Sequence, residues 1–291
     1  MKNNLMNQTV KWEELSSLTD REMNQLSIKQ DTVCQKIIRD LKSIEEFLNS
    51  FEDFGFERKL IVCRKSLFSL NVIMTSLQFT AGSISSCCKA GCLADANTLL
   101  RKYRDDMFFY LYIVIYNENQ FDVSAKSKIK EMENNINHWI NDGLENLKIT
   151  TVLSTIAFFP EVKRAVSEYK LKSFFDALGK RLNNYVHSNG IAYYNHRLDS
   201  FRRKEFQKDL EAILKDVRYI TVSFLFLLTL CSPITIMSTD YIDYLEFNLG
   251  PPTDSQYWVA PFIEDFFKSN LHLIDKNCIN YLRENTSMKF E

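Results

Sequence analysis

The sequence has little glycine and proline, 7 and 5 residues of 291, and this scarcity bears on the fold class. A sandwich or barrel of many short strands needs tight turns, which these two residue types usually supply. The chain also lacks a strong excess of charge, since its formal net charge is −1. This balance argues against a protein that binds a highly charged partner, such as a nucleic acid, over its whole surface. Because 45% of the residues are hydrophobic, a substantial core is expected, and together these features predict an all-α protein.

The motifs of several common enzyme classes are absent. The chain contains no P-loop, no glycine-rich dinucleotide fingerprint and no Gly-x-Ser-x-Gly elbow, so nucleotide-driven and serine-hydrolase functions lack support. The N-terminal stretch MKNNLMNQTVKWEELSS has no apolar run of the length that a secretory signal needs. Four of the seven cysteines lie apart in apolar surroundings that suit reduced, buried thiols: Cys34, Cys63, Cys231 and Cys278. We therefore expect a cytoplasmic protein.

Three cysteines lie together in the stretch CCKAGC, at Cys87, Cys88 and Cys92. A structural zinc site normally has four ligands and usually a second spaced pair of cysteines, and no such pair exists elsewhere in the chain. We therefore expect no metal and no cofactor. The favoured role for this stretch is to supply small residues where two helices approach each other or the chain turns.

Apolar residues recur every three or four positions over several stretches, which predicts helices. The expected long helices cover residues 31–54, 58–88 (with an interruption near Gly82), 93–117 and 160–188, followed by one that ends near Pro233. Two further short helices are expected at 127–142 and 150–159. The predicted fold is a bundle of long antiparallel helices with helical insertions and a C-terminal helical appendage.

This periodicity also suggests how the chain is divided. We expect a peripheral N-terminal segment over 1–29, a helical bundle over 30–235 with an insertion at about 118–160, and a C-terminal helical appendage over 236–291. Within the appendage, the stretch QYWVAPFIEDFF is rich in aromatic residues. It is either a helix that docks on the core or a surface for a partner.

The stretch from Tyr219 to Thr239 carries no charged residue and is as long as a membrane span. It also holds several serines and threonines and Pro233, and it continues the amphipathic stretch FQKDLEAILKDVRYI. A buried central helix that ends near Pro233 explains both features, so we expect no membrane among the partners. Membrane association through residues 219–239 is the alternative.

Charge is distributed unevenly along the chain. Ten basic residues face three acidic ones between Lys163 and Lys204, whereas nine acidic residues face four basic ones from Asp240 to Glu291. The basic segment is either a solvated helix face, which is the commoner outcome, or a surface that attracts phosphate groups.

Within the basic segment, the stretch RLNNYVHSNG places Arg181 six positions before His187. On a helix, His187 shares a face with Asn183 and Asn184, while Arg181 lies near Asn184 and Tyr185. An imidazole titrates near neutrality and can move protons, and a guanidinium offers a permanent charge and forked donors for phosphate oxygens. This combination suits metal-free RNA cleavage, in which the ribose 2′-hydroxyl attacks its neighbouring phosphate.

The same stretch resembles the motif of the HEPN superfamily, all-α proteins in which an arginine is followed by four to six residues and then a histidine. The stretch ANTLLRKYRDDMFFYLYI is similar to the helix that brings an arginine and an acidic residue to the same site in that family. The resemblance covers about residues 90–230, and Leu182 departs from the polar residue that often follows the arginine. It implies that Arg181 and His187 are catalytic. The candidates for supporting roles are Arg101, Arg104, Asp105, Asn183, Asn184 and Tyr185.

Many members of this superfamily are metal-independent ribonucleases, including toxins and anti-phage abortive-infection factors, and they work as dimers whose two motifs share a cleft. The resemblance therefore implies RNA as the substrate, a homodimer, and an antitoxin or regulatory protein as a further partner. The expected function is a metal-independent endoribonuclease in anti-phage defence or a toxin–antitoxin setting.

A separation of six residues does not guarantee contact between Arg181 and His187 within one helix. The two could converge where the helix begins or bends, or across two subunits. The alternative is an arginine paired with Glu168 or Asp176 and a histidine that caps a helix end near Gly190. In that case the chain is a catalytically inactive helical module that binds a protein or RNA.

Overall fold

The computed structural model describes residues 20–54, 60–63, 66–141, 149–155, 159–189, 203–249 and 258–290. These residues form mostly α-helices, with short 3-10 turns and one two-stranded hairpin. The all-α prediction is therefore confirmed.

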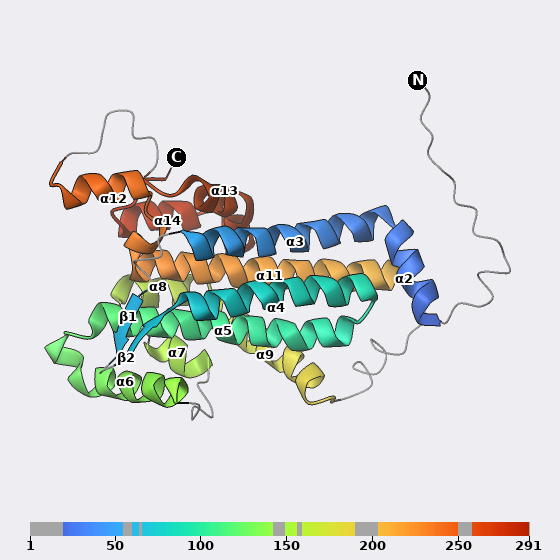
Figure 1. The fold of residues 1–291 in the computed structure, drawn as a ribbon, viewed down its shortest axis with the longest axis horizontal. Coiled ribbons are helices and arrows are strands. Elements are labelled where there is room, and N and C mark those ends of the chain that lie inside the picture. The colour runs from blue at the N-terminus through green and yellow to red at the C-terminus, as the bar shows by residue number, and fades with distance from the viewer. Residues whose placement is uncertain are drawn as a thin grey trace, which may run out of the picture.

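Four long helices form the body of the molecule: α3 (Thr32–Asp53), α4 (Asn71–Ala90), α5 (Leu93–Asn119) and α11 (Arg203–Cys231). They lie side by side, and α3, α4 and α5 run in alternating directions, while α2 (Asp20–Gln30) lies across one end of the bundle (Figure 1). Each of these helices carries apolar residues at helical spacing, and these residues pack together in one continuous core. The predicted bundle of long antiparallel helices is present.

Asp31 marks the start of α3 and ties it to α11. Its Oδ1 accepts hydrogen bonds from the backbone N–H groups of Val33 and Cys34, at 2.9 and 3.0 Å. These are donors that a helix N-terminus otherwise leaves unpaired. Gln207 of α11 donates to both oxygens of the same carboxylate at 3.0 Å. One side chain therefore begins a helix and attaches it to the centre of the bundle.

A hairpin replaces the first part of the helix that was expected from residue 58. Strand β1 (Leu60–Cys63) pairs antiparallel with β2 (Ser66–Ser69), with Ile61 opposite Phe68. In β1, Ile61 and Cys63 are buried while Leu60 is exposed, which is the alternation of a strand. The helical prediction was wrong here because a short apolar run fits either period, and packing against the bundle selects the strand.

The predicted interruption near Gly82 was also wrong, since α4 continues through it. A Cβ atom at Gly82 would lie 2.7 Å from Oε1 of Glu45 in α3. The glycine therefore leaves space for the Glu45 carboxylate against α4 and does not break the helix.

The apolar stretch after Tyr219 forms the second half of α11, and its side chains from Thr221 to Ser232 are buried. Two of its polar side chains bond within the helix: the hydroxyl groups of Thr221 and Thr229 each donate, at 2.7 Å, to the carbonyl oxygen four positions earlier. The helix ends at Cys231, before the 3-10 turn η4 (Pro233–Ile236), so the prediction of a buried helix ending near Pro233 is confirmed. Within the described ranges, every helix is too short or too polar to cross a membrane.

The insertion after α5 contains the 3-10 turn η2 (Val123–Ala125), α6 (Lys126–Ile140) and α7 (Ile149–Thr155). The helix expected over 160–188 is divided into α8 (Pro160–Glu168) and α9 (Leu171–Val186). Lys170 lies between them in the left-handed conformation, with φ +52°. On either side of this turn, both short helices bury an apolar face.

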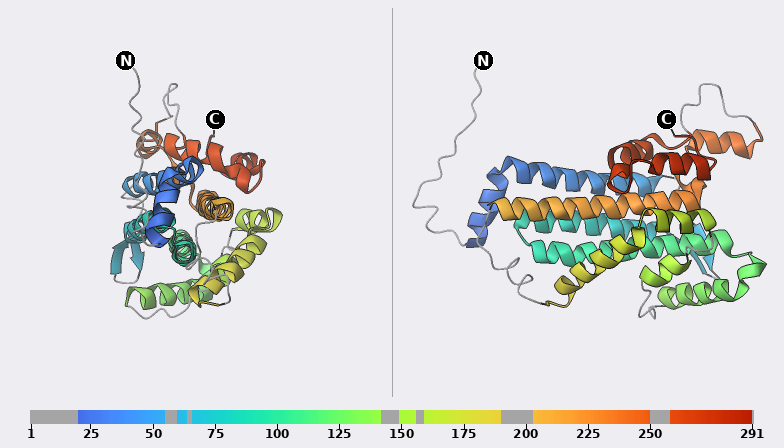
Figure 2. Two further views of the ribbon diagram at one scale, coloured as in Figure 1. Left: turned by 90° about the vertical axis from the view of Figure 1, so that its right-hand side faces the viewer. Right: turned by 180° about the vertical axis from the view of Figure 1, so that it is seen from behind.

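The C-terminal elements are α12 (Thr239–Glu246), α13 (Pro261–Asn270), the 3-10 turn η5 (Leu271–Leu273) and α14 (Cys278–Asn285). They cover one side of the bundle, and α6 and α9 lie on the opposite side (Figure 2). Phe266 of α13 stacks on Phe47 of α3 with ring centroids 4.1 Å apart, and Phe267 is fully buried. Of the two roles expected for this aromatic stretch, α13 takes that of a helix docked on the core.

Candidate functional site

The stretch RLNNYVHSNG contributes the last turns of α9, which packs against α5. Phe175 of α9 meets Phe108 of α5 edge to face, with ring centroids 4.6 Å apart. The buried side chains of α9 recur every three or four positions: Leu171, Phe175, Leu178, Leu182 and Tyr185. Leu182, which follows Arg181, is one of them, so the packing of α9 on the core leaves Asn183 and Asn184 exposed.

Polar side chains of three helices gather beside this apolar contact. They form two bonded groups, which we call together the α5–α9 polar cluster: Arg101, Arg104 and Asp105 of α5 with Asn183 of α9, and Arg181 of α9 with Asn97 of α5 and Asp216 of α11. Three guanidinium groups face two carboxylates in this cluster, so its net charge is positive. Such a group favours anions, and a guanidinium presents its donors in the geometry that phosphate oxygens accept.

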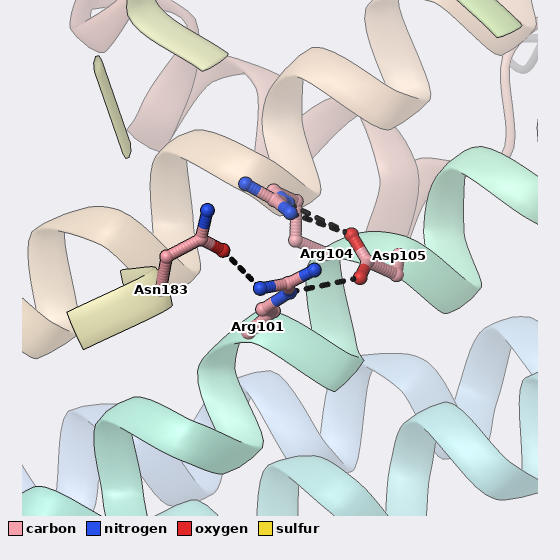
Figure 3. Close-up of polar contacts among 4 residues, drawn as sticks. All are labelled: Arg101, Arg104, Asp105 and Asn183. Atoms are coloured by element: carbon pink, nitrogen blue, oxygen red, sulfur yellow. Dashed lines mark hydrogen bonds and ion pairs between the residues drawn. The ribbon is translucent and has the colours of Figure 1, made fainter. Parts of the chain in front are cut away.

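Asp105 lies between two guanidinium groups of its own helix (Figure 3). Arg104 donates to Asp105 Oδ1 from Nε and Nη2, at 3.0 and 2.7 Å, and Arg101 Nε donates to Oδ2 at 3.4 Å. Arg101 also donates from Nη1 to Oδ1 of Asn183 in α9. This series of contacts joins the stretch ANTLLRKYRDDMFFYLYI of α5 to the stretch RLNNYVHSNG of α9.

Arg104 is buried, with 5% of its surface exposed, and its guanidinium lies against Gly179 of α9. A Cβ atom at Gly179 would be 2.9 Å from Arg104 Nη1. A side chain at this position would therefore displace the guanidinium. The absence of one lets Arg104 reach Asp105 while α9 remains close to α5.

Arg181 is bonded to α11 and to the beginning of α5. Its Nη2 donates to Asp216 Oδ2, and its Nη1 donates to Asn97 Oδ1 at 3.2 Å. Burial raises the pKa of Asp216, while the charge of Arg181 and its hydrogen bond act in the opposite direction. Arg181 therefore offsets part of the cost of burying a carboxylate.

The pairing of Arg181 with Glu168 or Asp176, which the sequence suggested, was wrong. Asp176 forms an ion pair with Lys172, one turn earlier in α9, at 2.7 Å. The partner of Arg181 is instead Asp216, 35 residues further along the chain. Proximity in the sequence favours pairs within a helix, whereas this pair exists only because α11 packs beside α9 and α5.

His187 is the C-cap residue of α9, and its side chain is exposed. Its backbone N–H donates to the Asn183 carbonyl oxygen at 3.0 Å. Six positions on a helix place His187 and Arg181 about 120° apart around the axis. In the part of the chain that the structure describes, no hydrogen bond or ion pair joins them. The capping position suggested for His187 is thus observed, while Gly190 lies outside the described residues.

The other residues of the motif differ in their surroundings. Asn184 is exposed, and its carbonyl oxygen accepts a hydrogen bond from the Asn189 N–H at 2.7 Å. Tyr185 is buried against the core, and burial raises its pKa. Ser188, with φ +51°, turns the chain out of the helix. Tyr185 therefore has a packing role, and Asn183 is the motif residue that contacts α5.

The structure brings Arg101, Arg104, Asp105 and Asn183 together, and it holds Arg181 separately on Asp216. Sequence reasoning missed three residues of the site: Asn97, Gly179 and Asp216. Asn97 could have been found, because it precedes Arg101 by four positions and therefore shares its helix face. Asp216 and Gly179 gave no local signal, because their roles depend on contacts between helices.

The chemistry open to this site is anion binding by the guanidinium groups and proton transfer by an exposed imidazole. Over the described ranges, no group of three or more histidine, cysteine, aspartate or glutamate side chains is placed to hold a metal ion. Cys87 and Cys88 lie in the last turn of α4, and Cys92 directly precedes α5. All three therefore lie at the turn between these two helices.

Comparison of the chain with protein-family models, with curated proteins and with solved structures gave no match. A functional proposal therefore rests on the side chains described above and on the motif.

Proposed function

We propose that the chain is a metal-independent endoribonuclease of the HEPN type, in which His187 is the general acid and base and Arg181 stabilises the phosphate. The observation that carries this proposal is the contact between the two stretches that the resemblance pairs, where Arg101 of α5 donates to Asn183 of α9. In the proposed reaction, the imidazole accepts the proton of the ribose 2′-hydroxyl as its oxygen attacks the adjacent phosphate. The imidazolium then gives a proton to the 5′-oxygen as the P–O5′ bond breaks, which leaves a 2′,3′-cyclic phosphate. The guanidinium offsets the negative charge that grows on the phosphorane.

The proposal includes a homodimer, because Arg181 and His187 of one chain leave α9 in different directions. His187 is exposed at the end of α9. Arg181 keeps 41% of its side chain exposed in spite of its bonds to Asp216 and Asn97. In a two-fold symmetric dimer, His187 of each copy would approach Arg181 of the other, which gives two equivalent pairs. The proposed setting is cytoplasmic, in anti-phage defence or with an antitoxin that controls the activity.

Incubation of the purified chain with total RNA in the presence of EDTA tests the proposal. We expect fragments that end in a 2′,3′-cyclic phosphate. In His187→Ala the cleavage rate should fall at least about 100-fold, since general acid–base groups typically contribute that much. His138→Ala removes an exposed histidine of α6 and should leave cleavage unchanged. Equal cleavage by wild type and His187→Ala, or no cleavage by wild type, would exclude the proposed enzyme.

A second candidate function is a catalytically inactive helical module that binds RNA or a protein. The hydrogen bonds of Arg181 favour this function, because two of its nitrogens already donate to Asp216 and Asn97 and so are not free for a phosphate. Such a module would bind a labelled single-stranded RNA with an affinity that falls as salt rises, and it would leave the RNA intact. Fluorescence anisotropy followed by electrophoresis of the same sample separates the two functions.

A further inference from the structure

Helix α4 ends in a tight turn that two backbone hydrogen bonds close. Gly91 has the left-handed conformation, with φ +80°, and its N–H donates to the Cys88 carbonyl oxygen at 3.1 Å. The Cys92 N–H donates to the Cys87 carbonyl oxygen at 2.8 Å. This is the Schellman pattern of helix termination, in which side chains at the positions of Cys87 and Cys92 frequently contact each other.

The second hydrogen bond limits the distance between the two cysteines. The Cα atom of Cys87 is joined covalently to the acceptor carbonyl, and the Cα atom of Cys92 is joined to the donor nitrogen. Together with the 2.8 Å hydrogen bond, these covalent distances place the two Cα atoms at most about 6.7 Å apart. Disulfides span Cα separations of about 4.4 to 6.8 Å, so the backbone already permits a bridge.

The neighbouring thiols are not equivalent. Cys87 and Cys92 are half-buried, whereas Cys88 is fully buried in the core. Burial raises the pKa of Cys87, and the charges of Asp95 and Cys92 raise it further. Reagents in solution can therefore reach this pair, while Cys88 is shielded from them.

We propose that Cys87 and Cys92 form a reversible disulfide and that the oxidant is a low-molecular-weight disulfide such as oxidised glutathione. The Cys92 thiolate attacks one sulfur of the oxidant, forms a mixed disulfide and expels one glutathione thiolate. Cys87 loses its proton to solvent and attacks the Cys92 sulfur, which closes the bond and expels the second glutathione. The protein loses two electrons and two protons, and the oxidant becomes two glutathione molecules.

The disulfide would lie at the turn where α4, α5 and α2 meet. The turn joins α4 to α5, and Ile28 of α2 lies against it: a Cβ atom at Gly91 would be 3.3 Å from Ile28 Cδ1. A disulfide across the turn closes a short ring there. Oxidation would therefore hold the ends of α4 and α5 together beneath α2.

Peptide mapping tests this site in the full chain. The protein is incubated with oxidised glutathione under native conditions, the remaining thiols are alkylated, and the product is digested with trypsin. Because Lys89 lies between the two cysteines, they fall in different tryptic peptides. The expected result is a linked pair of peptides that dithiothreitol separates.

Variants assign the bond to the right thiols. Cys92→Ala and Cys87→Ala should each lose the linked pair completely, and Cys88→Ala should retain it. Because Cys87 and Cys92 are only half-buried, their variants should keep the fold even if Cys88→Ala does not. Full alkylation of both thiols in the wild type, glutathione adducts without a linked pair, or a linked pair that persists in Cys87→Ala would overturn the proposal.

Discussion

Asp216, the ion-pair partner of Arg181, makes a contribution to the stability of the fold that depends on pH. Burial raises the pKa of this carboxyl group in the folded chain, although Arg181 opposes the shift. Between about pH 4, the ordinary value for an aspartate, and the raised pKa, the folded state binds more protons at this group than the unfolded state does. The stability that the protonated group contributes is therefore lost as pH rises through this window.

Asp216→Asn should remove this contribution to the pH dependence. We expect the free energy of unfolding of the wild type to fall more steeply than that of the variant as pH rises from about 4, because the amide does not titrate. Urea denaturation at a series of pH values measures both curves. Asp265→Asn, at an exposed position of α13, serves as the control and should follow the wild type. Parallel curves for wild type and Asp216→Asn would show that Asp216 makes no such contribution.

At the scale of helices, the contact between α5 and α11 contains one paired and one unpaired tyrosine hydroxyl. The Thr221 hydroxyl donates to the Val217 carbonyl oxygen at 2.7 Å, so the Tyr103 hydroxyl is the donor in its 2.7 Å contact with Thr221. Tyr110 is equally buried, and its hydroxyl has no hydrogen-bond partner among the described residues. Its ring packs edge to face on Phe224, with centroids 5.3 Å apart.

Substitution of each tyrosine by phenylalanine keeps the ring and removes only the hydroxyl. Tyr103→Phe should lower the free energy of unfolding by about 1 kcal/mol, the usual net contribution of a hydrogen bond. Tyr110→Phe should leave it unchanged or raise it, because a buried hydroxyl without a partner has lost its hydration without compensation. Chemical denaturation of the two variants provides the comparison. Equal losses would contradict the assignment of the two hydroxyl groups.

Helices were predictable where the apolar spacing continued over several turns. The stretch 31–54 predicted α3, and 93–117 predicted α5, each within two residues at its ends. The prediction failed at the β1–β2 hairpin and at Lys170, where the chain turns between α8 and α9. Both failures involve a few residues whose conformation depends on what packs against them, and a short apolar run does not reveal this.

At the scale of the whole molecule, the arrangement of Arg181 and His187 calls for two copies of the chain. Arg181→Ala and His187→Ala should each be inactive in the RNA assay. After the two variants are mixed and exchange subunits, half of the dimers are mixed, and each of these holds one intact pair of Arg181 and His187. Cleavage should therefore return to about a quarter of the wild-type rate, provided that the site is shared across a two-fold interface.

The control for this experiment is each variant alone at the same total protein concentration. Size-exclusion chromatography with one tagged variant shows whether mixed dimers have formed. If mixed dimers form and no cleavage returns, the pair does not act across the interface.

By itself, the sequence determined the fold class and most of the helices. Helical spacing of apolar residues recurs along the chain, and each helix must bury the face that this spacing creates. It also determined that Arg101 and Asp105 share one helix face, since residues four positions apart are neighbours. The burial of the uncharged stretch after Tyr219 followed from its continuity with an amphipathic helix.

Only the tertiary structure decided which side chains meet across helices. Asp216 became the partner of Arg181, and Gly179 gave space to Arg104, because α9 packs against α5 and beside α11. The same packing buried Leu182 and Tyr185 and left His187 exposed at the end of α9. A spacing of six residues specifies an angle on one helix, whereas contact with a third residue depends on how separate helices dock.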